Sequence, residues 1–120
     1  MTVRPILFVL ASLGCAAAAQ AGYTGPTAGP TLTTVRAVLE DGADEQLFTV
    51  TGHIVNRVGD EKYNFRDETG TILAEIDDKY FMNLTVDDKT TVELQGEVER
   101  DLIGAPELDV KRLTVLQPGG

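Results

Sequence analysis

In five segments of the chain, apolar residues or glycines alternate with polar residues at a period of two. This pattern constrains the fold more than any other feature of the sequence. Such alternation places one set of side chains on each face of a strand, so it predicts half-buried β-strands. The predicted strands cover residues 48–55, 63–67, 71–76, 91–100 and 108–116. The residues expected to face the core are Phe48, Val50, Gly52, Ile54, Tyr63, Phe65, Ile72, Ala74, Ile76, Val92, Leu94, Gly96, Val98, Leu108 and Val110.

Two short sequence features indicate how these strands connect. Gly52 lies in the middle of the first strand, where a glycine often marks a bulge or sharp bend of the kind that a closing barrel needs. The second and third strands are separated by Glu68-Thr69-Gly70, which predicts a tight hairpin. Asp67 just before this turn is expected to accept hydrogen bonds from the backbone near Gly70.

Helical periodicity is limited to two short segments. Residues 33–39 predict a helix capped by Thr33 or Thr34, with Val35, Val38 and Leu39 on one face. Residues 78–84 are ambiguous, because the apolar spacing in this segment also fits one or two helical turns that plug a barrel end. Residues 22–30 hold three glycines and two prolines, which predicts an extended arm without regular structure.

The resulting order is a helix, three strands, a helical insert and two strands. It predicts an all-β fold with short helices, namely a five-stranded OB-fold barrel. A five-stranded antiparallel sandwich remains the structural alternative. The expected division is a signal peptide at 1–21, a flexible Gly/Pro arm at 22–32, the OB-fold domain at 33–117 and a tail at 118–120.

The first 21 residues have the pattern of a secretory signal peptide. Arg4 supplies a short basic region, residues 5–19 are uncharged and largely apolar, and Ala19-Gln20-Ala21 forms a small-x-small cleavage site. We therefore expect a periplasmic protein that begins at Gly22. Two alternatives stay open: an uncleaved membrane anchor, and a lipoprotein acylated at Cys15, although Ser12-Leu13-Gly14 fits the lipoprotein pattern poorly.

Cleavage after Ala21 would leave a strongly acidic domain. It would hold nine basic and 19 acidic residues, a net charge of −10, and no cysteine. Binding of nucleic acid depends on Lys and Arg that neutralise phosphates, so this charge argues against a nucleic-acid partner. It also argues against a bare anionic membrane surface, and it favours solubility, association with cations or a basic partner.

The pattern of residues resembles the bacterial OB-fold (BOF) family of small periplasmic stress-tolerance proteins. The most specific stretch is Tyr63 to Ile72, continuing to Glu75-Ile76-Asp77. The other matching segments are Gly22 to Pro26, Thr33 to Val35, Val50 to Val55, Val92 to Val98 and Leu108 to Val110. Two departures are the absence of tryptophan and the Pro-Gly-Gly tail. The resemblance implies an OB fold connected with envelope, oxidative, metal or acid stress, and it carries over no catalytic residue.

No catalytic constellation is expected. Ser12 and Cys15 are the only serine and cysteine of the chain, and both lie in the predicted signal peptide. The single histidine, His53, therefore has no such nucleophile to activate in the mature domain and is too few for a histidine-rich zinc site. We expect it to be an exposed or half-buried strand residue. Paired carboxylates could support a small hydrolase, but a barrel of this size offers little cleft in which to desolvate them.

Four aspartates are candidates for a hard cation such as a divalent metal ion. Carboxylates are preferred ligands of calcium, and two Asp-Asp pairs flank the helical insert, where they could converge. No spacing matches an EF-hand loop, and no other cofactor is expected. The candidate metal residues are Asp77, Asp78, Asp87 and Asp88.

The outer face of the second and third strands is the predicted ligand surface, because OB folds commonly bind there. Tyr63 and Phe65 are assigned to the core, so the polar residues of the same hairpin point outward. The candidate ligand-binding residues are Lys62, Asn64, Arg66 and Glu75.

The favoured function is a non-enzymatic periplasmic binding module that contributes to envelope or stress tolerance through a small ligand, a cation or a cell-envelope partner. The alternatives are a regulatory interaction protein for a membrane enzyme or cell-wall glycan, and a small carboxylate-dependent hydrolase. Nucleic acid is not an expected partner, and an integral membrane protein is not expected.

Overall fold

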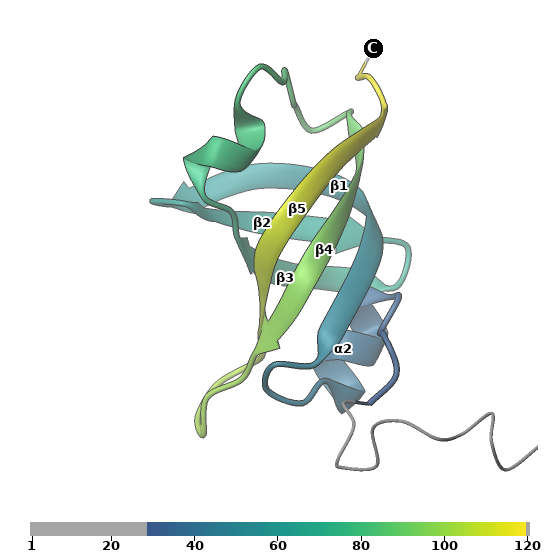
Figure 1. Ribbon diagram of the computed structural model, residues 1–120, viewed down its shortest axis with the longest axis vertical. Helices are drawn as coiled ribbons and strands as arrows, with labels where there is room; N and C mark the ends of the chain where they lie inside the picture. Colours follow the sequence, from purple (N-terminus) through teal and green to yellow (C-terminus); the bar gives the residue numbers. More distant parts are fainter. Residues whose placement is uncertain (1–28, 120) are drawn as a thin grey trace, which may run out of the picture.

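The computed structural model describes residues 29–119, which form a closed barrel of five strands with a short helix at one end (Figure 1). The predicted signal peptide, Cys15 and most of the predicted arm lie outside the described residues. No helix within residues 29–119 is long and apolar enough to cross a membrane. The elements are α2 (Val35–Asp41), β1 (Leu47–Gly59), β2 (Lys62–Asp67), β3 (Gly70–Glu75), the 3-10 helix η1 (Asp78–Phe81), β4 (Thr91–Glu99) and β5 (Glu107–Gln117).

The barrel closes in the order β1-β2-β3-β5-β4, and this confirms the predicted OB-type barrel. The first half of β1 pairs with β4, from Leu47 to Gly52, and the second half pairs with β2, from His53 to Gly59. All pairs are antiparallel except β3 with β5, which run parallel. The parallel pair closes the barrel because the insert between β3 and β4 (residues 76–90) carries the chain across one end.

Gly52 lies where β1 changes partner, as the sequence predicted for a bend at this residue. The next residue of β1, His53, already pairs with Arg66 of β2. A Cβ atom on Gly52 would overlap the carbonyl oxygen of Arg66, so the two strands approach too closely for any side chain. Gly96 plays the same part in β4, beside a register shift, where a Cβ atom would overlap the carbonyl oxygen of Asp109.

The predicted inward residues form one core, with burial that alternates along β1 and β4. Phe48 and Phe65 are its largest buried side chains, whereas Tyr63 is half-buried at the barrel end. Val35 and Val38 of α2 close the other end of the barrel. Leu32, the last residue of the predicted arm, is buried and bridges to Phe48, so the packing of the barrel includes this residue.

The start of α2 is held by three side chains, one of which is Thr69, whose hydroxyl accepts a hydrogen bond from the backbone N–H of Arg36 at 2.9 Å. Thr34 is the N-cap, and its hydroxyl accepts a hydrogen bond from the backbone N–H of Ala37 at 3.0 Å. Asp67, at the end of β2, accepts a second from the backbone N–H of Val35 at 2.9 Å. The helix runs from Val35 to Asp41 rather than over the predicted 33–39, because Thr33 and Thr34 precede its first helical residue.

The insert contains one 3-10 turn, at the short end of the predicted range. Its first residue follows Asp77, whose carboxylate accepts a hydrogen bond from the backbone N–H of Lys79 at 2.9 Å. Tyr80 and Phe81 pack against the core as expected, but Leu84 is exposed. Figure 1 shows the insert at one end of the barrel and α2 at the other.

Candidate functional site

A cleft of about 500 Å³ lies at the barrel end between the insert and the β1–β2 hairpin, and we call it the barrel-end cleft. Its floor is apolar, and its rim carries one cation and two carboxylates. This composition is typical of small-molecule sites, which are mostly apolar with a few polar groups that orient the ligand. The lining residues are Ile54, Val55, Asn56, Arg57, Tyr63, Phe81, Leu84, Val86, Asp87 and Asp88.

Two aromatic rings form one wall of the barrel-end cleft. The rings of Tyr63 and Phe81 lie 5.5 Å apart and tilted by 55°, a favourable geometry for an aromatic pair. The guanidinium of Arg57 lies 6.0 Å from the centre of the Tyr63 ring. Arg57 is further fixed by Asp60 at 3.3 Å and by the carbonyl oxygen of Gly59 at 2.9 Å. The wall therefore joins the insert to the barrel and presents a positioned positive charge.

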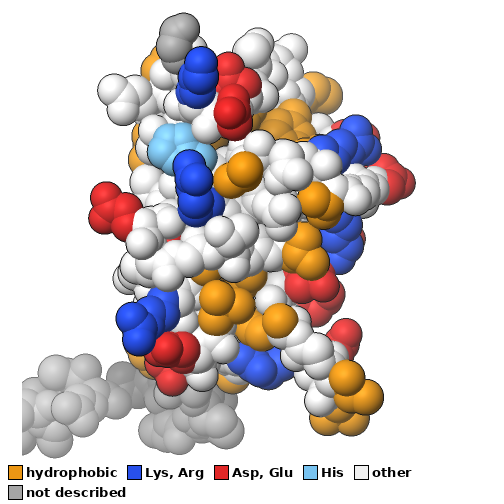
Figure 2. All heavy atoms as spheres, turned by 180° about the vertical axis from the view of Figure 1, so that it is seen from behind, with side chains coloured by type: hydrophobic (Ala, Val, Ile, Leu, Met, Phe, Trp, Pro, Cys, Tyr) orange, Lys and Arg blue, Asp and Glu red, His pale blue; other side chains and the backbone are white. Residues whose placement is uncertain are grey.

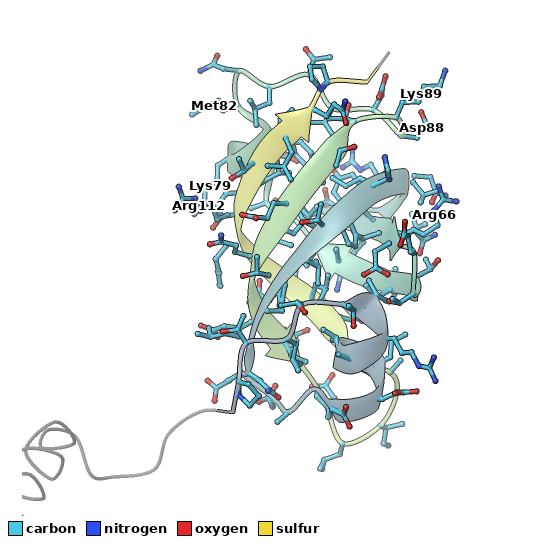
Figure 3. The ribbon with its side chains drawn as sticks, turned by 90° about the vertical axis from the view of Figure 1, so that its right-hand side faces the viewer. Arg66, Lys79, Met82, Asp88, Lys89 and Arg112 are labelled. Carbon is cyan, nitrogen blue, oxygen red and sulfur yellow. The ribbon has the colours of Figure 1, made fainter. Side chains whose placement is uncertain are left out.

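Asp87 and Asp88 also line the barrel-end cleft. The carboxylate of Asp87 accepts hydrogen bonds from the backbone N–H of Lys89 at 2.9 Å and from the hydroxyl of Thr90 at 3.0 Å. These hydrogen bonds, that of the Lys89 N–H first, hold the pKa of Asp87 below its usual value. Asp87 is thus a turn-forming residue that remains ionised. Asp88 is exposed and points away from the barrel (Figure 3).

The predicted convergence of the four aspartates is not found. Within residues 29–119, no three His, Cys, Asp or Glu side chains are grouped so that they could hold a metal ion. The reason is local. Asp77 and Asp87 each turn back to accept backbone hydrogen bonds, from Lys79 and Lys89 respectively. Asp78 and Asp88 are exposed beside them.

On the predicted ligand surface of β2 and β3, some polar side chains form hydrogen bonds within the protein and others do not. The ammonium of Lys62 donates to Glu107 of β5 at 2.6 Å and lies 4.0 Å from Glu75. The hydrogen bond with Glu107, partly offset by desolvation, raises the pKa of Lys62. Asn64 donates to Asn56 at 3.1 Å. Lys62 and Glu75 are therefore neighbours, but the polar groups of Lys62 and Asn64 are occupied by Glu107 and Asn56, which lie outside the predicted set.

Arg66, the remaining predicted ligand residue, lies apart from this network. It is exposed and, among the described residues, forms no ion pair or side-chain hydrogen bond. Its Cα partner across β2 and β3 is Thr71, and across β1 and β2 it is His53. Arg66 opens onto a second cleft on the side of the barrel.

Sequence reasoning missed Arg57, the cation of the barrel-end cleft. On the sequence it is an isolated basic residue beyond the predicted first strand (48–55), with nothing to separate it from the other scattered charges. The register of the β1–β2 hairpin, which makes Arg57 the direct partner of Tyr63, is the information that identifies it. That register includes two irregularities, between Ile54 and Asn56 and between Arg57 and Gly59.

The described residues offer little support for acid–base catalysis. Glu99 is a carboxyl whose pKa is raised, by desolvation and then by the nearby charge of Glu75. It is exposed at the end of β4 and lines neither of the two clefts. A raised pKa outside a cleft gives no place for a substrate.

Comparisons with known proteins identify the family. The model of the bacterial OB fold (BOF) protein family matches residues 12–115. The chain belongs to the bacterial OB-fold family. Family membership agrees with the resemblance carried by residues 63–77 and with the closed barrel.

Two relatives and one solved structure show how close the family likeness is. The calcium-regulated OB-fold protein CarO of Pseudomonas aeruginosa is 50% identical over 97 residues, which cover 81% of this chain and 82% of CarO. Protein YgiW of Escherichia coli K12 is 37% identical over 123 residues and 93% of each chain. The structure of the hypothetical protein YgiW from E. coli superposes with a TM-score of 0.66 at 39% identity, covering 81% of this chain and 100% of that one. These names designate no enzymatic activity.

Proposed function

We propose that this chain is a non-enzymatic binding module, exported to the periplasm, that contributes to envelope or stress tolerance by binding a small ligand in the barrel-end cleft. The observation that carries the proposal is the cleft itself, which is lined by the Tyr63–Phe81 wall, the positioned Arg57, Asp87 and Asp88. An amphipathic molecule with polar groups at one end fits this arrangement of an apolar floor and a charged rim.

A thermal melt of the chain from Gly22 tests the ligand part of the proposal. Divalent cations, cell-wall fragments and small metabolites are added separately as probes. A ligand that binds only the folded state stabilises it by about 2.7 kcal/mol at 100 times its dissociation constant. The expected result is a saturable rise in Tm with at least one probe. No rise with any probe would remove the small-ligand proposal.

Removing a charge inside the barrel-end cleft, and the same charge outside it, tests whether the ligand binds there. Arg57→Gln and Asp88→Asn should reduce the Tm rise, because both residues line the cleft. Arg112→Gln and Asp101→Asn make the same charge changes at exposed positions outside it and should leave the rise intact. A rise that is equally sensitive to both pairs would indicate general electrostatics and would contradict a site in this cleft.

Export is tested by the processed N-terminus. The pattern of residues 1–21 supports cleavage after Ala21, and the mature chain recovered from a periplasmic fraction should begin at Gly22. Recovery in the membrane fraction, abolished by Cys15→Ser, would instead establish the lipoprotein alternative. Full-length protein in the cytoplasm would overturn the export proposal.

An interaction protein is the second candidate, and the β4–β5 hairpin favours it. Leu102 and Ile103 at the tip of this hairpin are 106% and 89% exposed. Acidic residues lie beside them, since Asp101 is adjacent and Asp44 accepts a hydrogen bond from the backbone N–H of Arg100 at 2.9 Å. The tip therefore suits a partner protein with an apolar pocket and a basic rim.

Crosslinking in an envelope extract tests this second candidate. The double variant Leu102→Ser/Ile103→Ser should lose a specific crosslinked product. The control Leu47→Ser, a 49% exposed residue at the start of β1, should retain it. Equal yields from both variants would exclude the hairpin tip as the contact surface.

A further inference from the structure

A second cleft, of about 650 Å³, lies on the side of the barrel where β1 leaves β4 and joins β2. We call it the threonine cleft, because threonines contribute half of its lining. It is separate from the barrel-end cleft, and the two share no lining residue. Thr51, His53, Arg66 and Thr91 come from three different strands and meet there.

The centre of the threonine cleft is a cross-strand pair. His53 and Arg66 are direct Cα partners across β1 and β2, so their side chains lie next to each other on the same face. The Nε2 atom of His53 lies 3.4 Å from the hydroxyl oxygen of Thr91. Gly52 fixes this pair, because the strands approach so closely there that a Cβ atom would overlap the carbonyl oxygen of Arg66.

One cation, Arg66, lines this cleft, and its positive charge has no partner among the described residues. Of the basic side chains within residues 29–119, six have a carboxylate, a carbonyl oxygen or an aromatic ring as partner. Arg66, Lys89 and Arg112 are the three that have no such partner among the described residues. Figure 3 shows Arg66 and Lys89 on one side of the barrel and Arg112 on the other. In Figure 2 the single histidine lies between Lys or Arg side chains above and below it.

Two carboxylates also line the cleft, and one of them is engaged in hydrogen bonds. The carboxylate of Asp67 is occupied by hydrogen bonds from Val35, Thr69 and Gly70 and is thereby committed to the turn and to α2. The other carboxylate, that of Glu68, is exposed. The two carboxylates would repel a polyanion, so the cleft suits a single anionic group that Arg66 binds by direct hydrogen bonds rather than by net positive charge.

We propose that the threonine cleft binds the single oxyanionic group, carboxylate or phosphate, of a small hydroxylated molecule. Arg66 would donate a bidentate pair of hydrogen bonds to the oxyanion, and His53 would supply a further donor. The hydroxyls of Thr33 and Thr51 have no hydrogen-bond partner among the described residues and line the same cleft, where they can pair with ligand hydroxyls.

NMR titration of the 15N-labelled chain from Gly22 tests this proposal. The probes are glucose, gluconate, glucose 6-phosphate and inorganic phosphate, which separate the oxyanion from the hydroxyls and carboxylate from phosphate. Gluconate or glucose 6-phosphate should cause saturable shifts at residues 51–53, 66 and 91, whereas glucose should not. Stronger binding of one acid than the other identifies the oxyanion. Shifts confined to residues 81–88 would place the ligand in the barrel-end cleft and contradict the proposal.

Matched charge variants complete the test. Arg66→Gln should weaken binding about tenfold, the loss expected for one charge-assisted interaction. Lys89→Gln, which removes a cation on the same side of the barrel but outside the cleft lining, should weaken it less, and Arg112→Gln, which removes an equally free cation on the far side, should leave it unchanged. Equal weakening by Arg66→Gln and Arg112→Gln, or no saturable shift with any acid, would overturn the proposal. The amide spectrum of each variant verifies that it is folded.

Discussion

The carboxylate of Asp67 accepts a hydrogen bond from the backbone N–H of Val35 at 2.9 Å, although 32 residues separate them in the chain. The other oxygen of the same carboxylate accepts hydrogen bonds from Thr69 and from the backbone N–H of Gly70, at 2.6 to 3.1 Å. One side chain therefore closes the β2–β3 turn and also satisfies an N–H of the first turn of α2. This couples the helix to the hairpin that borders the threonine cleft.

Replacement of Asp67 by Ala should lower the free energy of unfolding by about 2 kcal/mol, the upper range for the loss of a helix cap. The change removes acceptors for backbone N–H groups in two elements at once. Urea denaturation followed by circular dichroism measures it. The control Glu68→Ala, at the exposed neighbouring position, should change stability by less than about 0.5 kcal/mol. Equal effects would show that the Asp67 hydrogen bonds contribute little.

Lowering the pH should weaken the hydrogen bonds by which Asp67 joins α2 to the β2–β3 turn. Burial alone would raise the pKa of Asp67, but hydrogen bonds from Thr69, Val35 and Gly70 outweigh it and hold this pKa below its usual value. The contribution is therefore complete above the unfolded-state pKa of about 3.9 and is lost as the pH falls through the lower folded-state value. Denaturation curves from about pH 6 to about pH 2 should show a smaller loss of stability for Asp67→Asn than for the wild type. Parallel pH profiles would contradict this assignment.

The cost of replacing a glycine should depend strongly on its position, because neighbouring strands approach closely at Gly52 and Gly96. Gly52→Ala and Gly96→Ala should each cost about 3 kcal/mol, because the new methyl group would overlap a backbone carbonyl oxygen of the neighbouring strand. Gly59→Ala is the control, since its Cβ would lie 3.6 Å from the side chain of Lys62, an ordinary contact. Thermal melts of the three variants should separate the two classes. Similar Tm values would show that the strands can move apart at little cost.

Much of the barrel was predictable because its signals are local. Alternation along β1 and β4 identified the buried face, Gly52 identified a bend in β1, and Asp67 identified the β2–β3 turn. Each of these features is decided by neighbours within a few residues or by the two faces of one strand. The second role of Asp67, at Val35, was not visible because it joins two elements far apart in sequence.

The candidate sites were less predictable because they depend on register and closure. Lys62 was assigned to a ligand surface, but closure of β3 against β5 brings Glu107 within 2.6 Å of it. Arg57 was overlooked, although the register of β1 and β2 makes it the partner of Tyr63. Residues that pair across distant strands have no characteristic separation in the sequence. Composition alone could therefore not distinguish charged side chains that form ion pairs from those that do not.

The Tyr63–Phe81 contact should hold the insert on the barrel. Its rings are 5.5 Å apart, and aromatic pairs of this kind contribute about 1 kcal/mol beyond the burial of their surface. A double-mutant cycle with Tyr63→Leu and Phe81→Leu should therefore give a coupling energy of about 1 kcal/mol. Amide hydrogen exchange within residues 82–88 should also become faster in either single variant, because the wall of the barrel-end cleft loses its anchor.

Met82 provides the control for this last prediction. It follows Phe81 directly but is 70% exposed, so Met82→Ala should change stability by less than about 0.5 kcal/mol and leave the exchange of residues 82–88 unaltered. A coupling energy near zero between Tyr63 and Phe81, with unchanged exchange, would mean that the insert is held by its other contacts. In that case ligand binding in the barrel-end cleft should tolerate Phe81→Leu, whereas an anchored wall predicts that the same variant weakens binding.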